Sequence, residues 1–200
     1  MSRSAGRSWR SFDPAQASAS AAPVGASLPC RVLGLDPGSL RTGWGIIDLN
    51  DAQGQVHVAN GCIRTGSGTL ASRLRAIHDG IVELMQQYRP QEVAIERVFV
   101  HRNPDSALKL GQARGVALLA ACQPGVDIHE YAPRAVKLAV VGTGAADKTQ
   151  VAHMICALLR ISAPLGPDAA DALAIGLCHA QARRLHNLRS AAVAAHRRAV

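Results

Sequence analysis

The chain has 200 residues, 48% of them hydrophobic, and a formal net charge of +8 at pH 7. This length suits one domain with a real hydrophobic core, and no apolar stretch is long enough to span a membrane. Five cysteines without a CxxC pair indicate neither a disulfide framework nor a zinc site, and they favour a reducing cytoplasm.

The positive charge lies mainly at the two ends of the chain. Residues 30–182 hold 14 basic and 13 acidic side chains, whereas the segments before and after them are rich in arginine. Charge alone is therefore weak evidence for nucleic-acid binding. It becomes stronger if the acids gather at one place and leave a basic surface elsewhere.

In chain order, the hydrophobic pattern predicts alternating strands and helices. Residues 31–36, 43–49 and 55–63 are expected to form three antiparallel strands. A helix follows from about Leu70 to Tyr88, with Thr69 as its N-cap. Later come strands at 92–96 and 126–132 and helices at 105–121, 133–141, 148–160 and 168–185. This order predicts an α/β fold with a mixed five-stranded sheet flanked by helices.

The domain boundaries follow from composition. Residues 1–29 are expected to be a disordered, basic Ser/Ala-rich extension, because they cannot bury enough apolar surface to become ordered. They lack the continuous apolar segment of a secretory signal, and a mitochondrial-type presequence stays an alternative. Residues 30–186 form the expected domain. Residues 187–200 are expected to be a basic flexible tail, although their alanines could form a loose helix.

Four acidic residues stand where ligands commonly bind. Asp36 and Glu96 each end an apolar strand, and α/β folds bind ligands at sheet ends. Asp168 and Asp171 share one face at the start of a predicted helix. Carboxylates from three segments would repel one another unless they hold hard divalent cations. Two such ions activate water and stabilise the leaving oxygen in phosphodiester cleavage, so the set indicates a metal-dependent nuclease.

Each acid also has a purely structural explanation. Asp36 could serve a turn, and Glu96 could be a surface acid at a strand end. Asp168 could be favoured by the positive end of a helix dipole, and Asp171 could serve the same purpose less well. The set favours a site because Asp36 and Glu96 each close a buried strand.

Several sequence blocks resemble one known family. The blocks are LGLDPGSLRTGWGII, GCIRTG, AIERVFVHRNPDSALKLGQARGVAL, VKLAVVGTGAADKTQVAHM and PDAADALAI. In this order, over residues 31–180, they resemble the RuvC family of Holliday-junction resolvases. The resemblance implies a ribonuclease-H-like fold, a homodimer and symmetric nicking of four-way DNA junctions in recombination and repair. It also implies Mg²⁺ dependence, with two ions per subunit and Mn²⁺ able to substitute, and cooperation with the RuvA/RuvB branch-migration complex.

The resemblance also implies roles for individual residues. The family's acidic tetrad falls on Asp36, Glu96, Asp168 and Asp171. Its DNA-binding positions fall on an aromatic residue that stacks on an opened base, on two lysines beside the scissile strand and on two phosphate contacts: Phe99, Lys137, Lys148, Arg102 and Lys109. Taken alone, the phenylalanine could be an ordinary core residue and each lysine an ordinary surface residue.

The helix at 105–121 is the expected dimer face. It carries small and apolar residues, and glycines at 111 and 115 would let a second backbone approach closely. A four-way junction has two-fold symmetry, so paired nicks require two chains related by a matching axis. The alternative is that this face packs only on its own sheet. The residues concerned are Ala107, Leu108, Gly111, Gly115, Leu118 and Leu119.

Two further patterns are assigned no role. The segment GTGAADKT has Asp147 where a P-loop needs glycine before its lysine, so it is not a nucleotide loop. Three histidines show no metal-ligand spacing and are interpreted as ordinary, although one near Glu96 could assist proton transfer. They are His101, His153 and His179.

Two other functions stay open at this point. The segment LGLDPGSLRTGWGIID also resembles the phosphate loop of actin-like and sugar-kinase-like ATPases, but that class needs a second such domain and the chain has one copy. A DNA-binding module without catalysis would have no use for four clustered acids. ATP binding and metal-dependent nicking distinguish the three functions.

Overall fold

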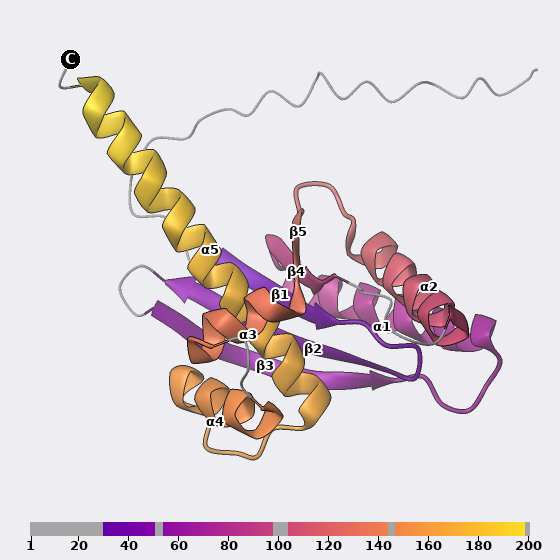
Figure 1. Cartoon of the computed structure of the whole chain (residues 1–200). Coiled ribbons are helices and arrows are strands. Elements are labelled where there is room, and N and C mark those ends of the chain that lie inside the picture. The colour runs from indigo at the N-terminus through magenta and orange to yellow at the C-terminus, as the bar shows by residue number, and fades with distance from the viewer. Residues whose placement is uncertain (1–29, 51–53, 98–103, 144–146, 199–200) are drawn as a thin grey trace, which may run out of the picture.

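The computed structural model describes residues 30–50, 54–97, 104–143 and 147–198. Within these ranges, five strands form one mixed sheet in the order β3-β2-β1-β4-β5 (Figure 1). The strands are β1 (Cys30–Asp36), β2 (Arg41–Asn50), β3 (Gly54–Arg64), β4 (Glu92–Glu96) and β5 (Asp127–Tyr131). The first three strands pair antiparallel, and β1, β4 and β5 are parallel. This arrangement confirms the predicted fold class.

Helices cover both faces of the sheet (Figure 1). One face packs against α1 (Leu70–Tyr88) and α2 (Pro104–Ala121). The other packs against α3 (Pro133–Val141), α4 (Lys148–Leu159) and α5 (Pro167–Arg198). Thr69 caps α1 as predicted, since its hydroxyl accepts a hydrogen bond from the Ser72 N–H at 3.2 Å. In the part of the chain that is described, no helix has both the length and the apolarity needed to cross a membrane.

The alternation of side chains along β1 and β4 decides which face carries the acids. Successive side chains of a strand point to opposite faces. Leu33 and Leu35 belong to the core cluster under α1 and α2, whereas Val32 and Ala94 belong to the cluster under α3 to α5. Asp36 has the parity of Val32, and Glu96 has the parity of Ala94. The acids that end both strands therefore lie on the side of α5.

Helix α5 lies very close to the sheet because glycines of β1 and β2 face it. A Cβ atom on Gly34 would lie 2.2 Å from the Ala172 carbonyl oxygen. A Cβ atom on Gly43 would lie 1.9 Å from the Asp168 carbonyl oxygen. Gly43 is also the β2 residue that pairs with Asp36. The first turn of α5 can therefore approach the end of β1 only because position 43 has no side chain.

Replacing Gly43 with alanine is expected to destabilise the fold, because the new methyl group would overlap a backbone oxygen rather than a mobile side chain. Overpacking of this kind typically lowers the free energy of unfolding by about 1–3 kcal/mol. Denaturant unfolding of Gly43→Ala measures the change. A free energy of unfolding within about 0.5 kcal/mol of the wild-type value would contradict the close approach, since ordinary surface substitutions stay within that range.

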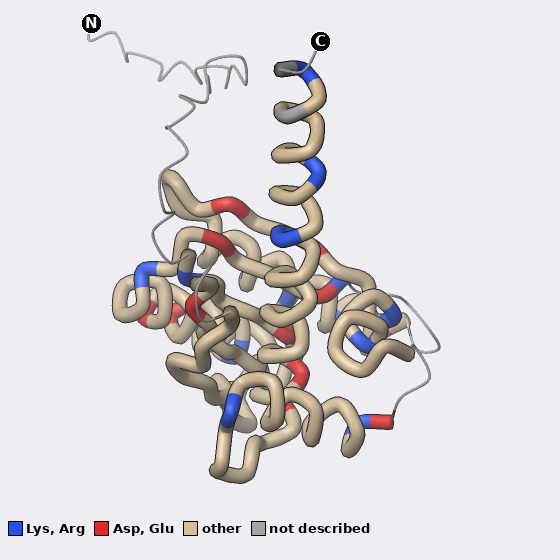
Figure 2. Tube along the Cα trace, turned by 90° about the vertical axis from the view of Figure 1, so that its left-hand side faces the viewer, with Lys and Arg blue, Asp and Glu red and all other residues tan. Residues whose placement is uncertain are grey.

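The end of α5 differs from the prediction. The helix continues to Arg198 instead of ending near 185, so residues 187–198, which were expected to form a flexible tail, are helical. Residues 182–198 contain no glycine or proline to end a helix and are rich in alanine, leucine and arginine, which are good helix formers. Figure 2 shows this segment projecting from the rest of the molecule with basic and no acidic residues. The other predicted elements agree with the structure within two residues at each end.

Candidate active site

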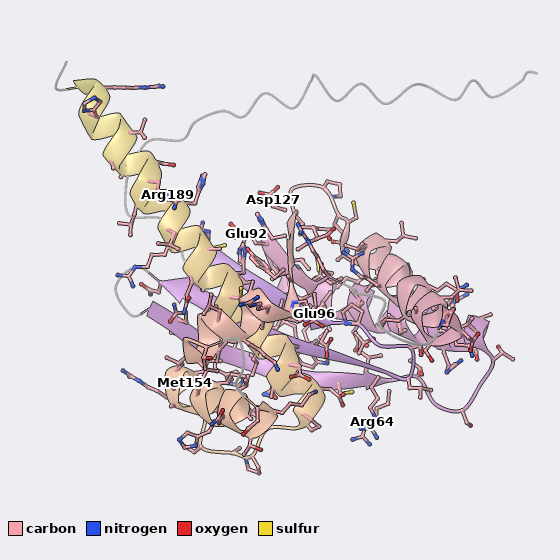
Figure 3. All side chains as sticks on the ribbon, in the orientation of Figure 1. Arg64, Glu92, Glu96, Asp127, Met154 and Arg189 are labelled. Atoms are coloured by element: carbon pink, nitrogen blue, oxygen red, sulfur yellow. The ribbon has the colours of Figure 1, made fainter. Side chains whose placement is uncertain are left out.

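Asp36 and Glu96 lie side by side at one edge of the sheet. Strands β1 and β4 are adjacent and parallel, and Leu35 pairs with Ile95 in their register. The residue after each of these is the acid that ends its strand. Figure 3 labels Glu96 at this end of β4 and Glu92 at the other end. The strand ends thus bring together two of the four predicted acids.

Asp171 joins them from α5. It lines the same cleft, which has a volume of about 310 Å³ and lies between the sheet edge and helices α3, α4 and α5. The lining residues are Asp36, Glu96, Pro133, Val136, Lys137, Lys148, Val151, Asp171 and Ala174. Carboxylates from β1, β4 and α5 therefore share one cleft whose remaining walls are largely apolar.

Two predicted lysines also line this cleft. Lys148 is the first residue of α4, and its Nζ donates a hydrogen bond to Asp171 Oδ2 at 2.9 Å. A capping box fixes the start of α4, because the Asp147 side chain accepts from the Gln150 N–H and the Gln150 side chain accepts from the Asp147 N–H. Lys137 reaches the cleft from α3. Cationic groups thus lie directly beside the acids.

Asp168 lies near this group but faces a different set of partners. Its Oδ2 accepts a hydrogen bond from the Cys62 thiol at 3.5 Å and lies 3.7 Å from Arg41 Nη1. Cys62 belongs to β3 and pairs with Gly43, so the contact follows from the same close approach of α5. Asp168 is not among the residues lining the cleft, yet its charge acts on Asp36. No sequence pattern indicates a role for Cys62 or Arg41, although Cys62 stands in the GCIRTG block.

Burial and mutual repulsion shift the pKa values of the two strand-end acids. Burial raises the pKa of Asp36 to about 7, and the negative charges of Glu96, Asp171 and Asp168 add to the shift, while Lys148 opposes it. Burial also raises the pKa of Glu96, with Asp171 adding to the shift. The hydrogen bond to Asp171 raises the pKa of Lys148. The cluster therefore carries more negative charge than its lysines neutralise.

These shifts predict how the stability of the metal-free protein depends on pH. The pKa of Asp36 is about 7 in the folded chain against an ordinary value of 3.8, so the folded state binds this proton more tightly than the unfolded state. The contribution of Asp36 to the free energy of unfolding therefore falls as pH rises from about 4 to about 7. Asparagine does not ionise, so the Asp36→Asn variant does not lose this part of the free energy of unfolding as pH rises.

In the presence of a chelator, Asp36→Asn is expected to melt several degrees above the wild type at pH near 8 and with no difference below pH about 4. Thermal unfolding at both pH values measures this. A wild type that melts as high as the variant at the upper pH would show that Asp36 is not under electrostatic strain.

The donor chemistry of the cluster fits hard divalent cations. Mg²⁺ binds oxygen ligands, and all four predicted ligands offer carboxylate oxygens. A buried carboxylate whose charged form is disfavoured by three others gains most from a bound cation. The four acids thus have the composition and the electrostatics of a metal centre.

The other three predicted DNA-binding residues do not line the acidic cleft or lie outside the described residues. Phe99 and Arg102 lie outside the described residues. Lys109 lies on α2 and forms an ion pair with Asp105 at 2.5 Å. It is not among the residues lining the acidic cleft. Its role as a phosphate contact stays a prediction.

Comparison with known proteins points to one family. The family model described as crossover junction endodeoxyribonuclease RuvC matches residues 32–179. A crossover junction endodeoxyribonuclease RuvC of Methylococcus capsulatus is 53% identical over 154 residues, which cover 77% of this chain and 92% of the relative. That of Dichelobacter nodosus is 55% identical over 151 residues, which cover 76% of this chain and 85% of the relative.

Solved structures agree with this. The chain resembles Thermus thermophilus RuvC in complex with a Holliday junction substrate, with a TM-score of 0.73 and 34% identity over 78% of this chain and 96% of that chain. It also resembles the yeast mitochondrial Holliday junction resolvase, with a TM-score of 0.55 and 13% identity over 78% and 81% of the two chains. The second likeness shows the fold alone.

Proposed function

The chain belongs to the RuvC family of crossover junction endodeoxyribonucleases, and from this premise we propose that it resolves four-way DNA junctions at the acidic cleft. The observation that carries the proposal is the convergence of Asp36, Glu96 and Asp171 from three elements, with Lys148 bonded to the last of them. Membership in a family of nucleases argues against the ATPase and against the non-catalytic module.

We assign the four acids to the binding of two Mg²⁺ ions per subunit, for which Mn²⁺ can substitute. When bound, these ions supply an activated water and stabilise the leaving oxygen in phosphodiester hydrolysis, which yields 5′-phosphate and 3′-hydroxyl ends. Asp36 is the central ligand, because the other three acids all act on its charge. Cys62 and Arg41 hold one oxygen of Asp168 and leave the other for the metal.

The lysines of the cleft have a second task. Lys137 and Lys148 lie at the cleft beside the carboxylates, where a phosphate of the scissile strand would approach. Their positive charges attract that phosphate, which the carboxylates alone would repel. Phe99, Arg102 and Lys109 extend the DNA contact as the family resemblance implies, with Phe99 stacking on an opened base.

We further propose that two chains form a homodimer through α2. One side of this helix is exposed and apolar or small: the side chains of Leu108 and Leu119 are 63% and 69% exposed, and a Cβ atom on Gly111 or Gly115 would meet nothing within 4 Å. Leu118, which was expected on this face, packs instead against the core under α1 and α2. A two-fold axis at α2 would give each dimer two acidic clefts.

The place and partners of the enzyme follow from the same assignment. Following the family resemblance, we propose that the enzyme works with the RuvA/RuvB branch-migration complex. All five cysteines are free, which suits the reducing cytoplasm in which we place the enzyme.

Cleavage of a synthetic four-way junction tests the proposal. We expect paired, symmetric nicks in the junction with Mg²⁺ or Mn²⁺, no cleavage in a chelator, and little cleavage of a linear duplex of the same sequence. Equal cleavage of the linear duplex would contradict junction selectivity. Cleavage in the chelator would contradict the role of the acids as metal ligands.

A further inference from the structure

A second cluster of potential metal ligands lies at the opposite end of β4. Glu92 begins the strand that Glu96 ends, and both have the same parity. With His129 of β5 and His179 of α5, Glu92 offers ligand atoms that all lie within 4.8 Å of one another. Glu92 and Glu96 are separated by about 13 Å along the strand. The cluster is thus distinct from the acidic cleft.

Partners at both ring nitrogens fix the orientation of His179. Its ring is buried, with Nδ1 at 2.7 Å from the Tyr131 hydroxyl and Nε2 in contact with Glu92 Oε2. Metal-binding histidines commonly donate their other ring N–H to an oxygen, which fixes the tautomer. An ionised carboxylate can only accept, so in the metal-free chain His179 Nε2–H donates to Glu92 and Nδ1 accepts from the Tyr131 hydroxyl. A bound cation would take the place of the proton on Nε2, and that proton would move to Nδ1, from which it can be donated to the Tyr131 oxygen.

The other two ligands lie close to His179. Glu92 accepts hydrogen bonds from His179 Nε2 and from Arg183 Nε, and the ring centroids of His129 and His179 are 4.5 Å apart. The ligand atoms of all three residues are therefore close enough to one another to share one ion.

This space is open to solutes. A cavity of about 410 Å³ is lined by Glu92, His129 and His179 together with two further potential donors, Asp127 and His186. A cation can therefore reach the cluster from solution.

We propose that Glu92, His129 and His179 bind one Zn²⁺ ion. Two imidazole nitrogens and one carboxylate oxygen are a known ligand set for Zn²⁺, with a fourth position left to water or to another side chain. Mg²⁺ binds oxygen ligands in preference to nitrogen. The acidic cleft would therefore bind Mg²⁺, and this cluster would bind Zn²⁺. The bound ion would fasten β4, β5 and α5 to one another.

Arg183 competes with the metal for Glu92. Its Nε donates a hydrogen bond to Glu92 Oε1 at 2.9 Å, and its side chain is 30% exposed, so the guanidinium can swing into solvent. Since a cation beside Glu92 repels this guanidinium, removal of Arg183 is expected to tighten Zn²⁺ binding. A site that is only a buried ion-pair network would show no such gain.

Titration of Zn²⁺ into the full-length, chelator-stripped protein in excess Mg²⁺ tests the proposal. We expect one Zn²⁺ per chain and a melting temperature that rises by about 5 °C or more at saturating metal. His129→Gln, a partly exposed position, should weaken binding at least about tenfold. Arg183→Gln should tighten it. Asp171→Asn, the matched control in the acidic cleft, should leave it unchanged.

Two measurements distinguish weaker binding that is caused by misfolding from weaker binding that is caused by the loss of a metal ligand. The metal-free melting temperature of His129→Gln should equal that of the wild type, and Co²⁺ in place of Zn²⁺ should show the absorption of a tetrahedral site with imidazole ligands. The proposal is wrong if no Zn²⁺ is retained in excess Mg²⁺. It is also wrong if binding is lost in Asp171→Asn and kept in His129→Gln, because the ion would then occupy the acidic cleft.

Discussion

Asp36→Asn is expected to lower the rate of junction cleavage by at least about 1,000-fold, or about 4 kcal/mol of transition-state stabilisation. The reason is that Asp36 is the carboxylate on which Glu96, Asp171 and Asp168 all act, and an amide holds a divalent cation far less well. Single-turnover cleavage of a labelled four-way junction in Mg²⁺ measures the loss.

Junction binding by the same variant should be nearly unchanged. Binding is expected from basic groups and from the shape of the DNA, and removal of a negative charge beside Lys148 does not weaken those contacts. A gel-shift titration of Asp36→Asn against the wild type is the control. Normal nicking by the variant would refute the assignment of Asp36, and loss of both binding and cleavage would assign it a structural role instead.

Leu119→Arg is expected to convert the dimer into monomers. Leu119 is 69% exposed on α2, so the substitution leaves the core of a single chain intact. In an isologous interface each substitution occurs twice, and both arginines would be buried without partners. We expect the dissociation constant of the dimer to rise at least about 100-fold, as measured by analytical ultracentrifugation. Paired nicking of the junction should be lost with it.

Leu188→Arg is the matched control, because Leu188 is 59% exposed but belongs to α5. It should leave the dimer and its paired nicks unchanged. A Leu119→Arg protein that remains dimeric would show that α2 is not the interface. A monomer that still nicks both strands in one binding event would show that resolution needs no dimer.

The strand-end acids could be predicted from the sequence because their position is a local property. Asp36 and Glu96 each follow an apolar run, and a parallel pair of such strands necessarily ends at one edge. The three-residue spacing of Asp168 and Asp171 predicts a shared helix face, but in the structure only Asp171 lines the cleft, whereas Asp168 contacts Cys62 and Arg41. The cleft itself depends on Gly43. A glycine is needed at this position only because α5 packs against it in the folded chain, and no local pattern reveals that contact.

Other features depend on contacts that no local pattern encodes. Glu92, His129 and His179 come from two strands and a helix, so no spacing between them could have indicated a site, and His179 was interpreted as ordinary. Cys62 meets Asp168 across 106 positions of sequence. The end of α5 could not be predicted because an Ala/Arg-rich segment is compatible with a flexible tail as well as with a helix, and in the structure its good helix formers continue the helix to Arg198.

A dimer with one wild-type subunit and one Asp36→Asn subunit tests most directly whether each chain contributes one complete cutting site. Differently tagged chains can be mixed, refolded together and purified as the mixed dimer. Single-turnover cleavage of a junction labelled on both opposed strands is then measured in Mg²⁺. We expect one strand of each bound junction to be nicked and the opposed strand to stay intact. Nicking of both strands within one binding event, or of neither, would contradict it.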